Sequence, residues 1–314
     1  MERFEGLLAV VTGGGSGMGR ELVRQLSAEG CSVATCDVHD DAVAETARLA
    51  EKEAPPGTRI TTHVCDVADG AAVERFRDEV VAQHATDHIN LLFNNAGVGG
   101  GGSFLNSDQG EWERTFGICW GGVYSCSRAF VPLLVASDDG YLVNTSSVNG
   151  FWALLGPGMP HTAYSSAKFA VKGFSEALIE DFRLNAPHVK VAVVMPGHIG
   201  TDIVSNSRKV HGGEGPLDAD ALVAARAQMA ERGVPVESMD DDAVQSLVDM
   251  MGDMFRDSAP MTAAQAATVI LDGVRAGKWR ILVGDDAHRL DERVRADPES
   301  VYGETAPTLG ILGS

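Results

Sequence analysis

Tyr164 and Lys168 are the residues of this chain whose types and spacing most directly suggest chemistry. They lie four residues apart in the stretch Ala163-Tyr-Ser-Ser-Ala-Lys168, so in a helix the phenol and the ammonium share one face. A tyrosine is a poor base near neutral pH, because its unperturbed pKa is about 10, but a nearby cation favours the phenolate and lowers that pKa. The pair can therefore transfer protons, although a Tyr and a Lys at this spacing more often serve packing and solvation.

A glycine-rich turn near the N-terminus has the composition of a phosphate site. The apolar run 7–11 leads into Thr12-Gly13-Gly-Gly-Ser-Gly17-Met-Gly19, and a helical pattern follows over 20–29. Glycines let a backbone approach a pyrophosphate closely, and the start of a helix supplies free N–H groups and the positive end of a dipole. The pattern is not the Gly-x-Gly-x-x-Gly fingerprint, and such a loop alone is as often a flexible turn. The residues expected to bind the dinucleotide here are Gly13, Gly15, Ser16, Gly17, Met18 and Gly19.

Asp37 strengthens the prediction of dinucleotide binding. A second apolar run, 31–36, ends at this acid, eighteen residues after Gly19. A carboxylate at the end of the second strand can bind a ribose 2′-hydroxyl. It would repel a 2′-phosphate, and neither Ser16 nor Val38 offers a cation, so the sequence predicts NAD rather than NADP.

Five motifs, taken in order, resemble those of the short-chain dehydrogenase/reductase family. They are the segment 12–19, Asn94-Asn-Ala-Gly97, Ser147, the pair Tyr164 and Lys168, and Pro196-Gly197. The resemblance implies an α/β fold of the Rossmann type, a doubly wound parallel sheet with helices on both faces. It also implies an NAD(P)-dependent alcohol dehydrogenase or ketoreductase. A catalytically weak, dinucleotide-binding sensor of the same fold is the alternative, although such a protein would normally lack the Tyr or the Lys. A dehalogenase-like relative is a further alternative, but it would lack the glycine turn.

The alternation of apolar runs and helical patterns agrees with that fold. Strand-like runs occur at 60–65, 89–94, 140–146, 189–195 and 279–283, and such alternation builds parallel βαβ units. Ligands of an open parallel sheet lie outside the carboxyl ends of its strands, where the motifs begin. We expect a single domain over 1–314. Its parts are a cofactor-binding and catalytic core at 5–201, a helical substrate-binding insertion at 202–260, a last helix and strand at 261–284, and a C-terminal extension at 285–314.

The resemblance assigns further residues to the cofactor. Asp66 would contact adenine through its side chain and Val67 through its backbone, although a turn or helix-capping Asp is as ordinary. Thr201 would hold the nicotinamide carboxamide, although it has the character of a helix cap as well. The full set implied beyond the glycine turn and Asp37 is Asp66, Val67, Asn95, Ala96, Gly97, Tyr164, Lys168, Pro196, Gly197, Ile199 and Thr201.

The resemblance also implies a mechanism. Tyr164 takes the alcohol proton as general base while hydride passes to the nicotinamide, Lys168 lowers the pKa of the tyrosine and holds the ribose, and Ser147 orients the substrate oxygen. Ser146 is the adjacent alternative to Ser147. The family's fourth catalytic residue, an asparagine in a kinked helix, is replaced here by Cys119. Its carbonyl can still hold a water, and flanking glycines permit the kink; otherwise Cys119 is a small buried residue.

The substrate side is predicted from two apolar segments. The first follows Ser147 and forms a pocket wall or a subunit contact; the residues expected to face the substrate are Ser147, Asn149, Phe151, Trp152, His161 and His198. His161 lies one helical turn before Tyr164, although a solvated loop histidine is the commoner case. The second is an amphipathic pattern at Leu247, Met250, Met251, Met254 and Phe255. It predicts either an extra core helix or a lid that closes opposite Phe151 and Trp152 over a bulky apolar secondary alcohol or ketone.

Composition limits the partners. A formal net charge of −19 over 314 residues opposes binding to nucleic acid and to anionic membrane surfaces. The five cysteines have no Cys-x-x-Cys spacing, so neither a disulfide set nor a zinc site is predicted. The first residues lack the apolar core of a signal peptide, and no run approaches the roughly 20 apolar residues of a membrane span, so we expect a cytoplasmic enzyme. The family resemblance implies a homotetramer or homodimer.

Overall fold

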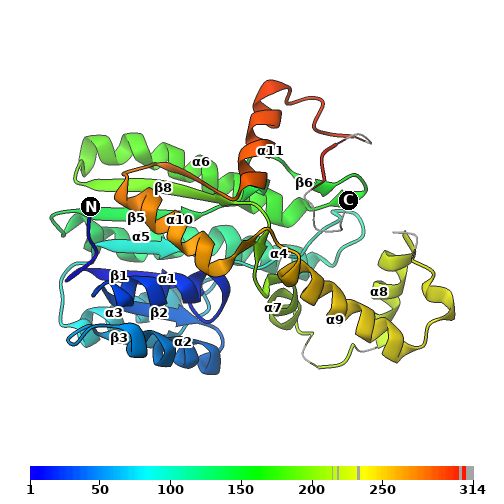
Figure 1. The fold of residues 1–314 in the computed structure, drawn as a ribbon, viewed down its shortest axis with the longest axis horizontal. Coiled ribbons are helices and arrows are strands. Elements are labelled where there is room, and N and C mark those ends of the chain that lie inside the picture. The colour runs from blue at the N-terminus through cyan, green and yellow to red at the C-terminus, as the bar shows by residue number, and fades with distance from the viewer. Residues whose placement is uncertain (214, 218, 232–233, 304–305, 309–314) are drawn as a thin grey trace.

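A seven-stranded parallel sheet forms the centre of the molecule (Figure 1). The computed structural model describes residues 1–213, 215–217, 219–231, 234–303 and 306–308. The strand order is β11-β8-β5-β4-β1-β2-β3, and the neighbours pair in parallel. The strands are β1 (Leu8–Thr12), β2 (Ser32–Asp37), β3 (Ile60–Val64), β4 (Leu91–Asn94), β5 (Gly140–Thr145), β8 (Val189–Pro196) and β11 (Arg280–Val283). Each predicted strand-like run is a strand of this sheet, so the predicted doubly wound α/β fold is confirmed.

Helices cover both faces of the sheet (Figure 1). One layer consists of α1 (Gly17–Ala28), α2 (Asp40–Glu53) and α10 (Ala263–Arg275), and the other of α3 (Gly70–His84), α5 (Gly122–Val135) and α6 (Thr162–Asn185). The apolar sides of these helices pack against alternate side chains of the strands, as in any sheet buried on both faces. The strands after β1 are added first on one side of it (β2, β3) and then on the other (β4, β5), so the strand order reverses between β1 and β4. The carboxyl ends of these two strands therefore border the crevice where such folds bind ligands.

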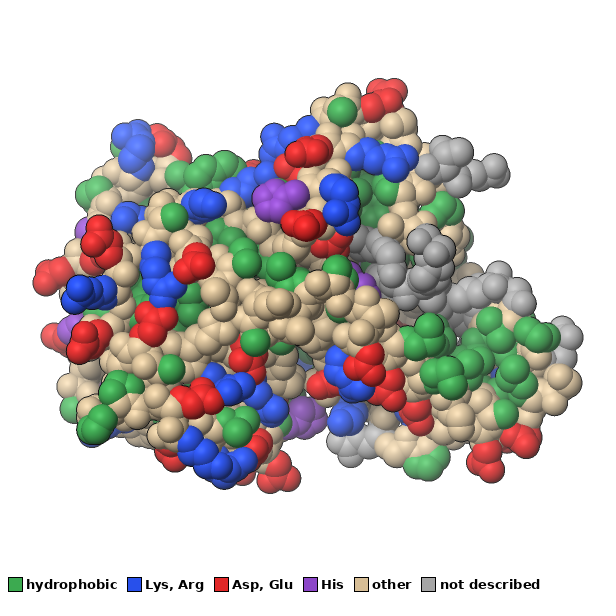
Figure 2. Space-filling model, viewed as in Figure 1, with side chains coloured by type: hydrophobic (Ala, Val, Ile, Leu, Met, Phe, Trp, Pro, Cys, Tyr) green, Lys and Arg blue, Asp and Glu red, His purple; other side chains and the backbone are tan. Residues whose placement is uncertain are grey.

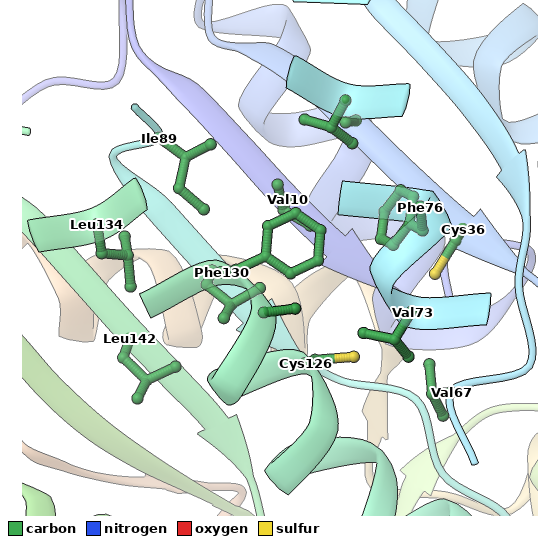
Figure 3. Packing of buried hydrophobic residues seen from close by; sticks show 14 of the residues in the cluster. Val10, Cys36, Val67, Val73, Phe76, Ile89, Cys126, Phe130, Leu134 and Leu142 are labelled. Carbon is green, nitrogen blue, oxygen red and sulfur yellow. The ribbon is translucent and has the colours of Figure 1, made fainter. Parts of the chain in front are cut away.

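The layer of α3 and α5 shows how the core is filled. Phe76 and Phe130 meet edge to face with 5.2 Å between ring centroids, and Val10 and Leu142 of the sheet lie beneath them (Figure 3). Cys36 and Cys126 are buried in this same cluster. All five cysteines are free and buried, as predicted for thiols that act as small apolar residues.

The helix before the core helix α5 is distorted. α4 (Gln109–Phe116) passes into a π-helical turn, η1 (Gly117–Gly121), and then into α5. The combined stretch 109–135 is long and apolar enough to cross a membrane, unlike any other helix in the described part of the chain. The sequence was expected to contain no stretch of this kind. Half of its most apolar window is buried in the protein, because α5 packs in the core. A core helix meets the same criteria, so the stretch is weak evidence for a span.

The segment 202–260 projects from the carboxyl edge of the sheet (Figure 1). Its helices are α7 (Ile203–Val210), α8 (Ala219–Glu231), the short η3 (Val236–Ser238) and α9 (Asp241–Asp257). Its two ends meet where β9 (Ile199–Gly200) pairs in parallel with β10 (Met261–Thr262). This pairing makes the segment an excursion from one point of the core.

The predicted amphipathic helix is α9, but it is not an extra core helix. Val244 is buried, whereas Met250 and Met254 remain 53% and 50% exposed. Hydrophobic side chains gather over α8 and α9 on the face that Figure 2 shows. The reason is positional: α9 packs against α7, α8 and β9 and does not reach the sheet. The core-helix interpretation of this pattern is therefore wrong.

The C-terminal extension packs on the loop that follows β5. That loop contains η2 (Val148–Gly150) and a hairpin of β6 (Leu154–Gly156) with β7 (Met159–Pro160), and the extension begins with α11 (Asp285–Ala296). Trp152 is fully buried among Val148, Leu290 and Val301, and its Nε1 donates to the Val301 carbonyl at 2.9 Å. Trp152 thus anchors Leu290 and Val301 of the C-terminal extension, and its fully buried side chain is not free to form the expected wall of a pocket.

Removing this anchor should destabilise the protein in two measurable steps. Trp152→Phe keeps most of the apolar volume but leaves the Val301 carbonyl without its donor, so the free energy of unfolding should fall by about 1–3 kcal/mol. Trp152→Ala adds a cavity and should cost about 3–5 kcal/mol. Denaturant unfolding measures both. Trp279→Phe is the control, because Trp279 is 46% exposed and should shift stability by no more than about 0.5 kcal/mol.

Candidate active site

A cavity of about 680 Å³ lies at the carboxyl ends of the central strands, within the usual size range of small-molecule sites. Its walls come from the glycine turn, from the ends of β2 and β4, from the loop after β3 and from α7. The residues predicted for the cofactor that line it are Gly13, Gly15, Ser16, Gly17, Met18, Asp37, Asp66, Val67, Asn95, Ala96, Gly97 and Thr201. One groove therefore collects motifs that are distant in the sequence.

The glycine turn is pressed against the end of β4. Gly13 has φ +67°, and a Cβ there would lie 2.8 Å from the Ala96 Cα, so a side chain would both strain the backbone and collide with it. The Thr12 hydroxyl accepts hydrogen bonds from the backbone N–H groups of Asn95 at 3.0 Å and Ala96 at 3.1 Å. The floor of the groove thus depends on the hydrogen bonds of the Thr12 side chain and on the close approach that Gly13, which has no side chain, permits.

Asp37 lies at one end of the groove with its carboxylate already oriented. It accepts from the backbone N–H of Gly15 at 2.9 Å and of His39 at 3.1 Å. Arg20 lines the same end, where its Nε donates to the Thr46 hydroxyl at 3.0 Å. No sequence motif predicted Arg20 as a cation near Asp37, where the ribose 2′-hydroxyl of a dinucleotide is expected. Its place directly after Gly19 was a visible signal.

Asp66 is paired with a cation that the sequence did not predict. Its carboxylate accepts from the Ala68 backbone N–H at 3.0 Å and forms an ion pair of 2.7 Å with Arg114 of α4. Both residues line the groove. An adenine that reaches Asp66 would therefore meet a carboxylate whose charge is balanced, and Arg114 would lie beside it.

Lys168 is buried beneath the other end of the groove. It is 2% exposed, and its Nζ donates to the Thr145 carbonyl at 2.8 Å. A Cβ on Gly97 would lie 3.3 Å from this Nζ, so the glycine leaves room for the ammonium. Burial lowers the pKa of Lys168, because a charged group loses hydration there.

The pKa of Tyr164 shifts in the direction opposite to the predicted one. Burial raises the pKa of Tyr164, the neighbouring Cys119 raises it further, and the Ser147 hydroxyl opposes both by hydrogen bonding to the phenol. Lys168 does not reverse the balance, because its Nζ lies over the ring at 5.4 Å from the centroid and donates to Thr145. The expectation that the lysine lowers this pKa is therefore not met in this arrangement; desolvation dominates.

The two adjacent serines have different partners. Ser146 donates to the Lys168 carbonyl at 2.7 Å, which ties β5 to α6. Ser147 accepts from the Asn149 backbone N–H at 3.1 Å and interacts with the Tyr164 phenol. Of the two alternatives left by the sequence, Ser147 is the one that faces the tyrosine.

Cys119 lies at the centre of the π-helical turn η1, which confirms the expected distortion of this helix. The side chain is fully buried, and its thiol donates to the Val98 carbonyl at 3.2 Å. π-Helical turns often mark functional sites because they release backbone groups from the regular helical pattern. The thiol already has a partner, so any catalytic contribution at this position falls to the backbone.

His161 is not a solvated loop residue. Its imidazole stacks on the Tyr164 ring with 4.7 Å between centroids and an interplanar angle of 11°. Burial lowers its pKa to about 4, and its Nδ1 is shielded from solvent without a hydrogen-bond partner. The fold brings it against the tyrosine because it lies immediately before α6.

The other residues predicted for the substrate serve the scaffold. Asn149 donates to the carbonyls of Trp152 at 2.9 Å and Leu154 at 2.7 Å and thus shapes the loop. Phe151 lies under the Arg280 guanidinium, 5.8 Å from the ring centroid. The His198 Nε2 lies 2.6 Å from the Phe255 carbonyl and joins α9 to the turn between β8 and β9. None of these four side chains lines the groove, because each is engaged elsewhere.

Six residues predicted for the cofactor do not line the groove: Gly19, Tyr164, Lys168, Pro196, Gly197 and Ile199. Pro196 is the last residue of β8 and is paired with Val283, Gly197 lies against the Asp286 carboxylate, and the Ile199 side chain is buried in the core. Their side of the β8 turn faces α11 and the core. Only Thr201 from this stretch lines the groove.

Helix α7 forms the roof of the groove, and no sequence motif predicted this role. Asn206 donates to the Ser16 hydroxyl at 3.0 Å, and the Ser207 hydroxyl accepts from the Gly99 backbone N–H at 2.7 Å. Ile203, Lys209 and Val210 line the groove from the same helix. The helix thus bridges the glycine turn and the loop after β4 across the groove.

The arrangement suits proton transfer beside a dinucleotide. A phenol, a serine hydroxyl and a buried ammonium lie together. The ammonium lies next to Gly97, which lines the same groove as the glycine turn at the start of α1. The phenol can take or give a proton, and the serine can hydrogen-bond the oxygen from which that proton comes.

Comparison with known proteins agrees with this geometry. The family model described as short chain dehydrogenase matches residues 7–211. The SadH protein of Mycobacterium tuberculosis, named as an oxidoreductase, is 33% identical over 295 residues, covering 94% of this chain and 92% of that protein. The meso-2,3-butanediol dehydrogenase of Serratia marcescens is 34% identical over 203 residues, 65% of this chain and 75% of that protein. A short-chain dehydrogenase/reductase from Burkholderia phymatum in complex with NAD has a TM-score of 0.75 at 26% identity, covering 98% and 99% of the two chains.

Exchanging each serine in turn should distinguish their roles. Ser147→Ala removes an interaction that lowers the pKa of Tyr164, so that pKa should rise. The ascending limb of the pH profile for alcohol oxidation, which requires the deprotonated phenol, should then move to higher pH. Ser146→Ala is the control: it should reduce stability but leave the midpoint in place. A midpoint that moves only in Ser146→Ala would contradict the assignment.

Proposed function

This chain belongs to the short-chain dehydrogenase/reductase family, and we propose that it is an NAD-dependent oxidoreductase that interconverts a secondary alcohol and its ketone. The observation that carries the proposal is the cluster of Tyr164, Ser147 and Lys168, whose lysine lies against Gly97 in the lining of the groove that the glycine turn helps to build. A sensor that only binds a dinucleotide would have no need of a buried phenol and a buried ammonium, both of which are costly to ionise there.

In the proposed reaction, one side chain of this chain transfers the proton and another orients the substrate oxygen. When bound, the nicotinamide cofactor supplies the hydride chemistry. Tyr164 takes the proton of the alcohol in oxidation and returns it in reduction, while Ser147 hydrogen-bonds the same oxygen. Burial raises the pKa of the phenol, so oxidation needs positive charge near it. Lys168, with Nζ 5.4 Å from the ring centroid, is the cation of this chain that lies there. The residues that would hold the cofactor are those of the glycine turn together with Asp37, Asn95 and Thr201.

NAD is proposed over NADP because of Asp37. Its carboxylate is fixed by two backbone N–H groups at the end of the groove, where a 2′-hydroxyl can donate to it and a 2′-phosphate would be repelled. Arg20 is the residue that argues the other way, since it brings a cation to the same wall. Its Nε is engaged by Thr46, and this supports the NAD assignment.

The substrate is proposed to be a bulky apolar alcohol or ketone. The support is the exposed apolar surface of the insertion: Val204 of α7, Met250 and Met254 are 41–53% exposed. Methionine adapts to irregular apolar shapes, and a hydrophobic substrate would cover such surface. We do not propose Phe151 and Trp152 as the wall of the substrate pocket opposite α9, because their side chains pack under the C-terminal extension.

Tyr164→Phe tests the catalytic assignment. The variant keeps the ring and removes the proton acceptor, so turnover of secondary alcohols with NAD should fall by about 10² to 10⁴, while NAD binding, measured by fluorescence titration, should persist. Tyr124→Phe is the matched control, because Tyr124 is 48% exposed and should retain full activity. A loss of less than about tenfold in Tyr164→Phe would assign the base to another residue.

Asp37→Ala tests the cofactor assignment. The wild-type protein should show a higher kcat/KM with NAD than with NADP. The variant should have a lower ratio of these two values, because the carboxylate that repels a 2′-phosphate is gone. Asp41→Ala, which removes a carboxylate from the same groove wall, should leave the ratio unchanged. Adding Arg20→Ala to Asp37→Ala should remove any gain with NADP if the guanidinium binds the phosphate. Equal efficiency of the wild type with both cofactors would refute the proposal.

A further inference from the structure

His161 is held rigidly against the tyrosine that the proposed reaction uses. The two rings are nearly parallel, with 4.7 Å between their centroids and 11° between their planes. The backbone on either side of the histidine is fixed: its carbonyl accepts from the Ser165 N–H at 3.0 Å, and the Thr162 N–H donates to Gly102 at 2.9 Å. The Thr162 hydroxyl accepts from the Trp112 Nε1 at 3.1 Å. The imidazole therefore occupies a defined place beside the phenol.

One nitrogen of this ring lacks a partner. Nδ1 of His161 is shielded from solvent and makes no hydrogen bond within the described residues. Buried polar atoms in native proteins are nearly always hydrogen-bonded, and an exception calls for an explanation such as a missing ligand. Among the unpartnered atoms of the described chain, this one belongs to the ring that stacks on Tyr164. A ligand that reaches the phenol would therefore also come close to the imidazole.

The imidazole is neutral at physiological pH. Burial lowers its pKa to about 4. A neutral imidazole has one N–H donor and one acceptor nitrogen. It suits a hydroxyl or a carbonyl and offers nothing to a carboxylate or a phosphate that would require a cation. It also adds no charge to the phenol, so it cannot replace Lys168.

We propose that His161 hydrogen-bonds a second oxygen of the substrate, on the carbon next to the one whose oxygen meets Tyr164 and Ser147. The preferred substrates are then a vicinal diol, an α-hydroxy ketone or a 1,2-diketone with an apolar body. The imidazole lies directly against the phenol ring, with 4.7 Å between centroids, so a second substrate oxygen that reaches it is expected on a neighbouring carbon and not at the far end of the molecule. This inference rests on the proposed alcohol–ketone function and narrows it.

Such a contact discriminates strongly between substrates. A site with a buried polar group that pairs with a substrate hydroxyl rejects an analogue without it, because the group is then left unpaired. His161 is accordingly a positioning and specificity residue. Its loss should lower the preference for the second oxygen and should leave the proton transfer at Tyr164 intact.

The experiment compares 1-indanol with both diastereomers of 1,2-indanediol, with NAD as the acceptor, in the full-length protein. The wild type should oxidise one diol with a kcat/KM at least about tenfold above that of 1-indanol, since a paired polar contact is worth about that factor or more. His161→Phe keeps a ring against Tyr164 but has no nitrogen, so the diol should fall to the level of 1-indanol, and 1-indanol should change by less than about threefold. His161→Asn keeps a donor and an acceptor near the position of Nδ1 and should restore part of the preference. His288→Phe, at an exposed position of α11, should behave as the wild type.

Each other result has a defined meaning. Equal loss on both substrates in a folded His161→Phe protein would overturn the inference and assign the ring a packing role. A wild type that oxidises 1-indanol as well as either diol would also overturn it, while leaving the proposed function intact. Binding of NAD without turnover of any of these alcohols would instead refute the proposed function and the inference with it. If thermal unfolding shows that His161→Phe does not fold, His161→Asn is compared with the wild type instead. A weaker preference for the diol with unchanged activity on 1-indanol then supports the inference, and any other result overturns it.

Discussion

A buried chain of hydrogen bonds fixes the catalytic helix to the sheet, and the site depends on it. The Asn94 side chain donates to the Asn144 side-chain oxygen at 2.8 Å, and Asn144 donates in turn to the Ser175 hydroxyl at 3.0 Å. The chain runs from β4 through β5 into α6, the helix that carries Tyr164 and Lys168. Ser146 adds a second tie from β5 to the Lys168 carbonyl. Because these groups are fully buried, breaking one bond would strand a polar atom, and so the network specifies a single placement of α6.

The same placement explains why three ionisable side chains near the groove all tend toward their neutral forms. Burial raises the pKa of Tyr164, lowers that of Lys168 and lowers that of His161. Electrostatic interactions are stronger in a desolvated environment, so a charge that a ligand brings would act strongly on these three groups. The positive nicotinamide of an oxidised cofactor would enter such an environment. This links the rigid scaffold of α6 to the chemistry proposed for Tyr164.

The insertion between β9 and β10 combines an anchored part and a projecting part. α7 is tied to the glycine turn by Asn206 and to the loop after β4 by Ser207. Farther along, Arg256 of α9 pairs with Asp202 at 3.1 Å, and the rest of α8 and α9 extends away from the sheet (Figure 1). The roof of the cofactor groove is therefore part of the scaffold, whereas the apolar surface of α8 and α9 lies outside it. In the proposed function, cofactor and substrate would thus be served by different parts of one segment.

The sequence by itself determined the sheet, the glycine turn and the set of residues around Tyr164, because these depend on local patterns. Apolar runs of strand length, glycines at required close approaches and a spacing of four on a helix can each be recognised without knowing the partner. The family resemblance also predicted the distortion around Cys119, which the flanking glycines permit. What only the tertiary structure decided are the properties that depend on distant neighbours. Trp152 and Phe151 turned away from the groove because α11 covers them, and the methionines of α9 stayed exposed because that helix never reaches the sheet. His161 became buried because the start of α6 presses it onto Tyr164, and the pKa of that tyrosine followed its burial more than its lysine, since desolvation depends on the whole surrounding fold and no spacing in the sequence encodes it.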